Sequence, residues 1–311
     1  MKLSLAYIIL VLLISNETIS IKDNEISQKA GEQNKYKLDP TLAPSENFDL
    51  TSFKLTIPTD EDTNGKSDNI SEKKLNKGYQ SEYFYTAKDG GMVFKCPSHG
   101  TTTPNSNYVR VELREMLRKG DKSIKAKGVN KNNWVFSSAP VADQEAAGAV
   151  DGEMKATLAV NHVTTTGKKN HIGRLIIGQI HANSDEPIRL YYRKLKDNDL
   201  GSIYFAHEIF DGDDTYYEII GGGSGSLDNP IDGIALNEKF SYTIKVVGNT
   251  LNVTLSREGK EDIVKVVDMS ESGYDKGGAY QFFKAGIYHV NNTADKDDYA
   301  QVTFYDLEVI H

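Results

Sequence analysis

Short runs in which apolar and polar residues alternate fill the chain from residue 48 onward. Clusters of Gly, Asn, Asp and Ser separate the runs, and long helical periodicity is absent from the sequence. A period of two places successive side chains on opposite faces of a strand, so each run predicts a strand with one face in a core. The predicted strands are residues 54–57, 108–113, 175–181, 242–247, 251–255, 263–267 and 302–310.

Two turn signals predict antiparallel hairpins. The segment Val247-Gly248-Asn249-Thr250 lies between two alternating runs, and the Phe-Asp-Gly-Asp-Asp segment at 210–214 precedes Tyr216. Many short, closely spaced strands predict an all-β antiparallel sandwich or jelly roll that forms a single domain.

The first 45 residues have a different character. Lys2 precedes an apolar run at residues 3–14, which is shorter than the ~20 residues that span a bilayer, so residues 1–20 are predicted to be a secretory signal peptide. A buried N-terminal strand or helix is the alternative. Polar residues dominate 21–45, which predicts a flexible leader before a domain at 46–311. We therefore expect a secreted or periplasmic protein without membrane insertion after the signal is removed.

Charge and cysteine content narrow the classes of function. The 311 residues include 36 Lys and Arg against 44 Asp and Glu, a net charge of −8, which argues against a general nucleic-acid binder. A local basic groove can still bind an anion. Cys96 is the single cysteine, which excludes an internal disulfide and any Cys-based zinc site, and we expect it to fill space in a strand.

Polar side chains share a face on three predicted strands. Arg110, Glu112 and Arg114 alternate with apolar residues, so two guanidiniums flank a carboxylate in an arrangement that suits an anion. A solvated strand face with cross-strand ion pairs is the alternative. Gln179 and His181 share a face at the end of the second strand, where a structural histidine is the alternative.

The third strand carries Lys284 and Tyr288 on one face, with Gly286 between them. A glycine there is expected to allow close approach of a ligand. A half-buried aromatic strand with a partly buried lysine is the alternative. Together the three strands would bring Arg, Gln, His, Lys and Tyr into one groove, which predicts a site that holds a carboxylate and moves a proton.

These segments resemble the three signature motifs of the family 7 polysaccharide lyases, the alginate lyases. The resemblance rests on Arg110–Glu115, on Gln179-Ile180-His181 and on residues 283–288, in the family's order. It extends over residues 48–310, including the segments at 48–58, 92–103 and 132–134. Two positions depart from the family pattern: Val290 stands where the family usually has Gln, and Val111 where a small polar residue is usual. Alternation places Val290 on the face of Tyr288 and Val111 in the core.

The resemblance implies a β-jelly roll, of the concanavalin-like sandwich type, with a concave substrate groove, and β-elimination without a metal or other cofactor. Arg110, Gln179 and His181 would neutralise the uronate carboxylate, and Tyr288 would act as acid and base if nearby cations depress its pKa. Glu112, Arg114 and Lys284 would support substrate binding, with Glu112 holding both guanidiniums.

The stereochemistry of the sugar divides the proton transfers further. In mannuronate, Tyr288 could both take the C5 proton and protonate O4, whereas in guluronate His181 would be the base. Members of the family that this chain resembles look more tolerant of guluronate when Ile and not Val is at the centre of the triplet, so the resemblance implies that Ile180 accompanies guluronate-containing blocks.

Several alternatives remain open. The chain could be a lyase of another polyuronate, such as a glucuronan, or a non-catalytic jelly-roll carbohydrate-binding module. A glycoside hydrolase would need two carboxylates facing one bond, and no strand carries a convincing pair.

Residues 221–226 are expected to form a flexible connection or a mobile lid over the groove. We expect a monomer whose partner is an anionic polysaccharide, alginate.

Overall fold

Two antiparallel sheets make up most of the compact unit that runs from Pro40 to His311. The computed structural model of the chain describes residues 36–226 and 228–311. In spatial order, the larger sheet contains β12 (Asp214–Ile220), β11 (Leu200–Glu208), β10 (Asp185–Arg193), β9 (Arg174–Ala182), β17 (Gln281–His289), β5 (Arg110–Glu115), β1 (Phe53–Ile57) and β2 (Asp68–Ile70). Short strands extend it: β13 (Ile234–Ala235) pairs with β11, and β6 (Trp134–Val135) pairs with β17 and with β7 (Ala149–Val150).

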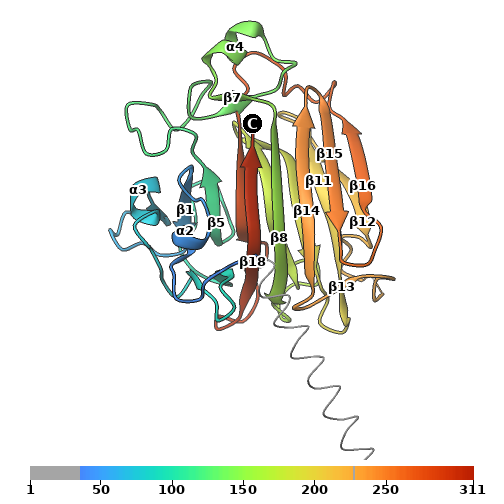
Figure 1. Cartoon of the computed structure of the whole chain (residues 1–311). Coiled ribbons are helices and arrows are strands. Elements are labelled where there is room, and N and C mark those ends of the chain that lie inside the picture. The colour runs from blue at the N-terminus through green and yellow to red at the C-terminus, as the bar shows by residue number, and fades with distance from the viewer. Residues whose placement is uncertain (1–35, 227) are drawn as a thin grey trace, which may run out of the picture. The chain divides into compact units, whose positions relative to one another are not determined.

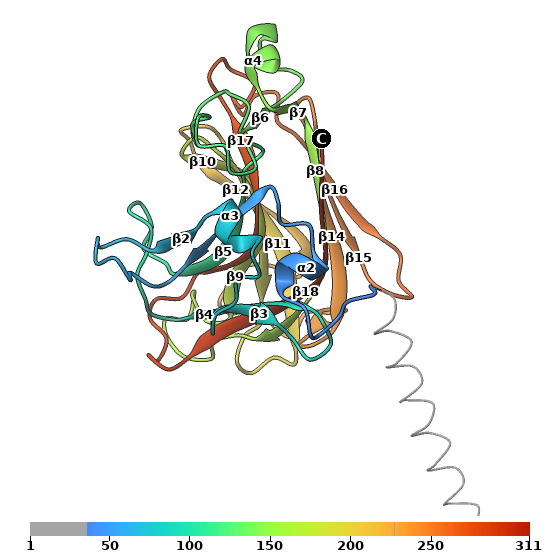
Figure 2. The same ribbon diagram turned by 60° about the vertical axis from the view of Figure 1, so that its left-hand side comes forward.

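The smaller sheet packs against the larger one. Its order is β16 (Ile263–Asp268), β15 (Thr250–Ser256), β14 (Lys239–Val247), β8 (Gly152–His162), β18 (Tyr299–Ile310), β4 (Met92–Pro97) and β3 (Phe84–Thr86). Figure 1 shows β18, β8 and β14 to β16 toward the viewer, and Figure 2 shows the two layers after rotation. In the described residues the helices are short: α2 (Pro44–Asn47), α3 (Glu72–Leu75) and α4 (Val141–Ala146). The predicted all-β antiparallel sandwich is confirmed.

Alternating burial explains why these segments form strands. Buried and partly exposed residues alternate along most of β14, and its buried side chains Phe240, Tyr242 and Ile244 lie in the core. The Tyr242 hydroxyl crosses to the larger sheet and donates a hydrogen bond to the Ile177 carbonyl at 3.0 Å. The core therefore lies between the two sheets, as the period of two indicates.

Both predicted hairpins are present. β14 and β15 pair up to Val247 and Thr250 around Gly248, whose φ of 56° suits glycine in a tight turn. β11 and β12 are joined through residues 209–213, where the Ile209 amide donates to the Asp213 carbonyl at 3.2 Å. The second hairpin brings β12 to the edge of the larger sheet.

The N-terminal predictions fall mostly outside the described residues. The expected signal peptide at 1–20 and most of the expected leader at 21–45 are not described. From Pro40 the chain belongs to the compact unit, and the Leu42 carbonyl accepts a hydrogen bond from the Thr86 hydroxyl at 2.7 Å. Within the described residues, no helix has the length and apolar character to cross a membrane.

The three strands of the predicted motifs are neighbours in the middle of the larger sheet. β17 pairs with β5 on one side and with β9 on the other. The register sets Tyr288 opposite Arg110 and Ile176, and Lys284 opposite Arg114 and Gln179. The fold therefore brings together side chains that lie more than a hundred residues apart in the chain.

Candidate active site

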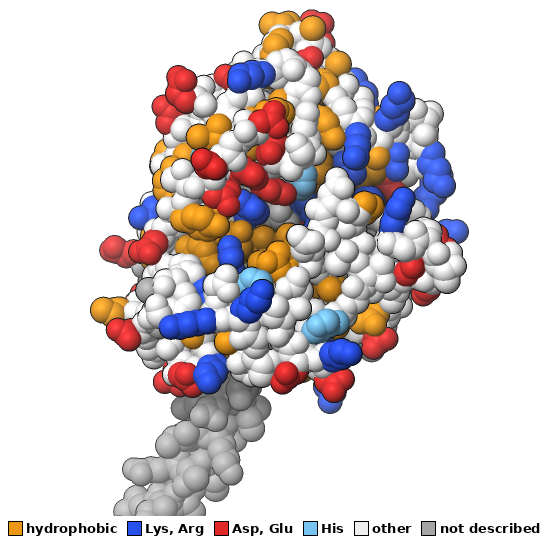
Figure 3. Space-filling view, turned by 180° about the vertical axis from the view of Figure 1, so that it is seen from behind, with side chains coloured by type: hydrophobic (Ala, Val, Ile, Leu, Met, Phe, Trp, Pro, Cys, Tyr) orange, Lys and Arg blue, Asp and Glu red, His pale blue; other side chains and the backbone are white. Residues whose placement is uncertain are grey.

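The exposed face of the larger sheet carries the predicted site. Val111, Leu113 and Ile180 on β5 and β9 are fully buried, so the polar residues that alternate with them face away from the core. Figure 3 shows the back of the molecule, where the surface is hollowed in the middle. Acidic side chains gather on one side of the hollow, and hydrophobic side chains lie beside them.

Glu112 is the centre of the polar cluster. Its side chain is 2% exposed and accepts hydrogen bonds from Gln179 Nε2 and Lys284 Nζ, and its Oε2 lies 3.2 Å from Arg110 Nη1. Arg114 does not join this group: its Nη2 donates to the Ala126 carbonyl at 2.8 Å, and its guanidinium lies 3.9 Å from the centre of the Phe282 ring. The prediction that Glu112 holds both guanidiniums is therefore wrong, because Arg114 extends toward the 117–133 loop.

Lys284 is buried against Glu112. Burial and the charge of Arg110 lower its pKa to about 8, although Glu112 opposes the shift. The lysine is 6% exposed and forms an ion pair with Glu112, so it offsets the Glu112 charge.

Tyr288 lies beside Arg110 and Ser106. The Arg110 guanidinium is 4.0 Å from the centre of the tyrosine ring, and Ser106 Oγ is 2.8 Å from the tyrosine hydroxyl. Burial raises the pKa of Tyr288, and the Arg110 charge and the Ser106 hydrogen bond offset only part of that rise. The expectation that cations depress this pKa is wrong for the free protein, in which burial is the larger effect and Tyr288 is a neutral phenol at pH 7.

His181 stacks on Phe282, with ring centres 5.0 Å apart and planes 12° apart. Its Nε2 lies 3.2 Å from Glu186 Oε1. Burial lowers the pKa of His181 well below its ordinary value, and the charges of Lys284, Arg110, Arg114 and Arg189 add to this effect. The imidazole is therefore neutral at pH 7 and able to accept a proton.

Glu186 was not identified from the sequence. Burial and a hydrogen bond with Glu208 raise its pKa to about 8, while Arg189 opposes the rise. Arg189 also forms an ion pair with Asp214 on β12. The acidic residues of 185–186 gave no periodic signal because β10 is irregular between Asp185 and Ile188.

Gly286 has a role different from the predicted one. Its φ is 130°, and β17 has an irregularity between Ala285 and Tyr288 in its pairing with β9. A Cβ on this residue would lie 2.7 Å from the Val111 carbonyl oxygen and 2.9 Å from the Phe94 ring. Glycine is required by the bulge and by the core, not by a ligand in the groove.

Three apolar predictions are confirmed. Val111 and Cys96 are fully buried. Val290 belongs to a cluster of buried residues against which Tyr288 packs, so it lies on the tyrosine's face. The cluster also contains Ile176, Tyr191, Tyr204 and Ala206.

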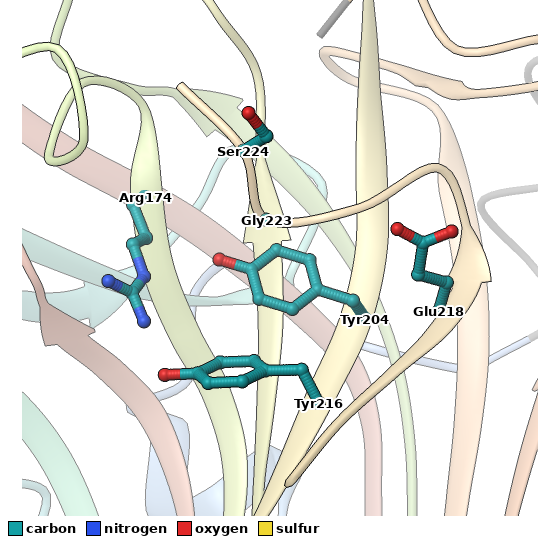
Figure 4. A pocket seen from close by; sticks show the side chains of 6 residues that line it. All are labelled: Arg174, Tyr204, Tyr216, Glu218, Gly223 and Ser224. Carbon is teal, nitrogen blue, oxygen red and sulfur yellow. The ribbon is translucent and has the colours of Figure 1, made fainter. Parts of the chain in front are cut away.

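The same face continues across β10, β11 and β12. Tyr191 pairs with Tyr204, and Tyr204 with Glu218, and a pocket of about 480 Å³ lies at this end. Figure 4 shows the residues that line it: Arg174, Tyr204, Tyr216, Glu218, Gly223 and Ser224. Apart from the 221–226 connection, none of these was predicted, because only the register reveals that they share a face.

No group of three or more His, Cys, Asp or Glu side chains within 36–226 and 228–311 is placed to hold a metal ion.

Comparison with known proteins identifies the family. A family model described as alginate lyase matches residues 48–311. An alginate lyase from Klebsiella pneumoniae is 55% identical over 280 residues, which cover 86% of this chain and 91% of that protein. The chain belongs to the alginate lyase family.

Solved alginate lyases share the fold. The crystal structure of the alginate lyase from Klebsiella pneumoniae has a TM-score of 0.85 and 54% identity, and the match covers 86% of this chain and 98% of that one. Alginate lyase A1-II', a member of polysaccharide lyase family 7, has a TM-score of 0.64 and 26% identity over 86% of this chain and 98% of its own. The resemblance to family 7 lyases is confirmed, and the two-sheet sandwich is the predicted jelly roll.

Proposed function

We propose that this alginate lyase family member cleaves the 1,4-linkages of alginate by β-elimination in the groove over β5, β17 and β9, leaving 4,5-unsaturated uronate ends. The observation that carries the proposal is that one face of three neighbouring strands presents Arg110, Gln179, a neutral histidine and a neutral tyrosine. Such a face supplies a base, an acid and donors for a carboxylate.

Arg110 and Gln179 are assigned to the uronate carboxylate. Removing the C5 proton puts negative charge on the adjacent carboxylate, and donors fixed before the reaction stabilise that charge. Glu112 fixes both donors, because it accepts hydrogen bonds from Arg110 and Gln179 at once. The buried Nε of Arg110 has no hydrogen-bond partner in the described residues, which leaves a donor for the substrate.

His181 and Tyr288 are assigned to proton transfer. His181 is neutral at pH 7 and is the better base of the two, whereas the raised pKa of Tyr288 makes its phenol a proton donor to the departing O4. In guluronate the C5 proton and O4 leave from opposite faces of the ring, so two separate groups suit that sugar. This division of roles supports a preference for guluronate-containing blocks.

Named relatives agree with these two residue types. The structure of alginate lyase A1-II' with the substrate GGMG was solved for a variant with one His-to-Asn and one Tyr-to-Phe substitution. Its complex with the product GGG carries a Tyr-to-Phe substitution. For this chain, we assign the same chemistry to His181 and Tyr288, with Arg114 and Lys284 supporting the substrate face.

The elimination is tested by ultraviolet absorbance, because each cleavage creates a conjugated uronate that hydrolysis does not create. We expect absorbance to rise with alginate and the Tyr288→Phe variant to lose about 100-fold or more in rate. Tyr85→Phe, in β3 of the other sheet, is the matched control and should keep the wild-type rate. A flat trace with alginate but a rise with glucuronan would move the assignment to another polyuronate.

Binding of alginate without any absorbance change would instead indicate a carbohydrate-binding module. The guluronate preference has its own test, a comparison of guluronate-rich and mannuronate-rich polymers with His181→Asn. We expect the variant to lose more activity on the guluronate-rich polymer. Equal losses on both polymers would contradict the assigned base.

The remaining assignments concern the whole chain. We propose a monomer that is exported through a signal peptide at residues 1–20, and the leader expected at 21–45 would then end before Pro40, where the compact unit that carries the lyase site begins. N-terminal sequencing of the secreted protein and light scattering test these assignments.

A further inference from the structure

The pocket at the β12 end of the groove has the chemistry of a uronate site. Arg174 enters it from the start of β9, Tyr204 from β11, and Tyr216 and Glu218 from β12. In Figure 4 the Arg174 guanidinium lies on the side of the Tyr204 and Tyr216 hydroxyls, and Glu218 lies on the opposite side of the Tyr204 ring. A cation and a carboxylate therefore face the pocket from opposite sides.

The charge of Arg174 is not used by the protein's own carboxylates. Among the described residues Arg174 forms no salt bridge, whereas Arg189 on the next strand reaches Glu186, Glu208 and Asp214. The Arg174 guanidinium lies 4.6 Å from the centre of the Tyr191 ring, and its Nε is buried without a hydrogen-bond partner. The Arg174 side chain also hydrogen-bonds to the Tyr216 and Tyr204 side chains. It has no carboxylate partner among the described residues, so its charge can bind an anionic group of a ligand.

Tyr216 supplies an exposed ring on which a sugar can lie, next to the buried pair Tyr191 and Tyr204. Tyr191 and Tyr204 stack with ring centres 4.8 Å apart and planes 3° apart. The Tyr216 ring centre lies 6.3 Å from that of Tyr204, and Tyr216 is 52% exposed. Glu218 would repel a carboxylate but accepts hydrogen bonds from hydroxyl groups, as Ser224 does. The two sides of the pocket therefore favour opposite edges of a uronate ring.

The wall of the pocket is fixed by Arg193. Its guanidinium donates to the Gly223 carbonyl and, through Nη2, to the Lys169 carbonyl at 2.7 Å. Its Nε donates to the Ile172 carbonyl at 3.3 Å. The connection at 221–226 is thus tied to the 169–172 segment at the edge of the pocket.

The distance between Tyr288 and Tyr204, which lines the pocket, corresponds to about three sugars. Tyr288, Ile176, Tyr191 and Tyr204 lie opposite one another on β17, β9, β10 and β11. Three strand spacings of about 4.8 Å separate the first from the last, and each 1,4-linked uronate advances by a similar length. We propose that this pocket binds a uronate two or three residues from the cleaved bond, with its carboxylate on Arg174 and its hydroxyls toward Glu218 and Ser224.

The proposal rests on the proposed lyase activity and is tested by chain length. We expect Arg174→Gln to raise KM about tenfold for a hexauronate, the loss of one charged contact, with kcat within about twofold. For the shortest oligouronate that the wild-type protein cleaves, both constants should stay within about twofold. Tyr216→Ala, at an exposed position, should show the same dependence on length.

Lys245→Gln is the matched control, because it removes one cation from an exposed position on β14 of the other sheet. It should leave both substrates unaffected. Equal losses of Arg174→Gln on short and long substrates, or no loss on either, would overturn the pocket assignment while the lyase activity stands. Absence of cleavage by the wild-type protein would overturn the proposed function itself.

Discussion

Glu112 compensates for the buried positive charge of the active face. A carboxylate that is 2% exposed is stable only with hydrogen bonds and opposite charge around it, and Arg110, Gln179 and Lys284 provide both. Lys284 in turn has Glu112 as its ion-pair partner. The substrate donors and the stability of the sheet therefore depend on the same side chain.

Replacing Glu112 with Gln should destabilise the protein by about 3–5 kcal/mol, because the Lys284 charge is left buried and unpaired. Urea unfolding measures the loss. Glu153→Gln, which breaks partly exposed pairs with Lys155 and Lys245, should cost about 1 kcal/mol or less.

The double variant Glu112→Leu with Lys284→Met removes both charges together. It should recover much of the stability that Glu112→Gln loses, while elimination stays impaired. Stability of Glu112→Gln equal to the wild type would show that the pair is not coupled.

At the scale of the residue, the sequence predicts which groups share a face but not how they are protonated. The alternation of apolar and polar residues was sufficient to predict the strand face on which Arg110, Glu112 and Tyr288 lie. The pKa of Tyr288 could not be predicted because it depends on burial by neighbouring strands. Glu186 and Arg174 were missed because their approach to the groove depends on the register of β9 and β10.

Strand β17 joins the two halves of the site. It pairs with β5 in regular register and with β9 through a bulge, so its side chains meet two different sets of partners. The bulge passes through Gly286, whose φ of 130° is unfavourable for other residues. The predicted strand was correct, but the irregularity has no signal in the sequence except the glycine itself.

Gly286→Ala should lower the free energy of unfolding by about 3 kcal/mol or more, since the new methyl would meet both the Val111 carbonyl and an unfavourable φ. Gly259→Ala is the matched control: its φ is 70°, and no atom lies within 4 Å of the new methyl. That variant should cost about 1–2 kcal/mol, the backbone effect alone. Equal costs at the two positions, measured by chemical denaturation, would show that the predicted collision relaxes.

The two sheets meet at His289, which follows Tyr288 on β17. It is 1% exposed, and its Nδ1 donates to the Pro97 carbonyl on β4 at 3.0 Å. Burial lowers its pKa to about 4, with the Pro97 hydrogen bond opposing the shift. The imidazole is therefore neutral in the folded protein where the unfolded chain would protonate it.

This difference predicts a loss of stability in acid. Between pH 6.5 and about 4 the unfolded state binds a proton at this histidine and the folded state does not, so stability falls as the pH falls. The contribution is about 3 kcal/mol at most. His289→Asn should flatten the dependence of the unfolding free energy on pH in this window, measured by urea unfolding at pH 7 and 4.5. An unchanged slope would assign the acid sensitivity to other groups.

At the scale of the molecule, the sequence predicts the class of fold better than the spatial order of the strands within each sheet. Alternation predicted the antiparallel sandwich, and its two turn signals predicted the hairpins around Gly248 and residues 209–213. The position of β17 between β5 and β9 depends on contacts between residues far apart in the chain, which a local pattern does not contain. The pocket at the β12 end could not be predicted from the sequence for the same reason.

Tyr288, Ile176, Tyr191 and Tyr204 lie opposite one another on four neighbouring strands. A polymer that follows these residues crosses the strands instead of running along one of them. Each successive sugar would then meet a different strand, with β17 at the cleaved bond and β11 and β12 near the far end. Substitutions in the β11–β12 hairpin could therefore change which sugar is accepted at a distant position while the chemistry stays intact. Selection could diversify such an enzyme one hairpin at a time.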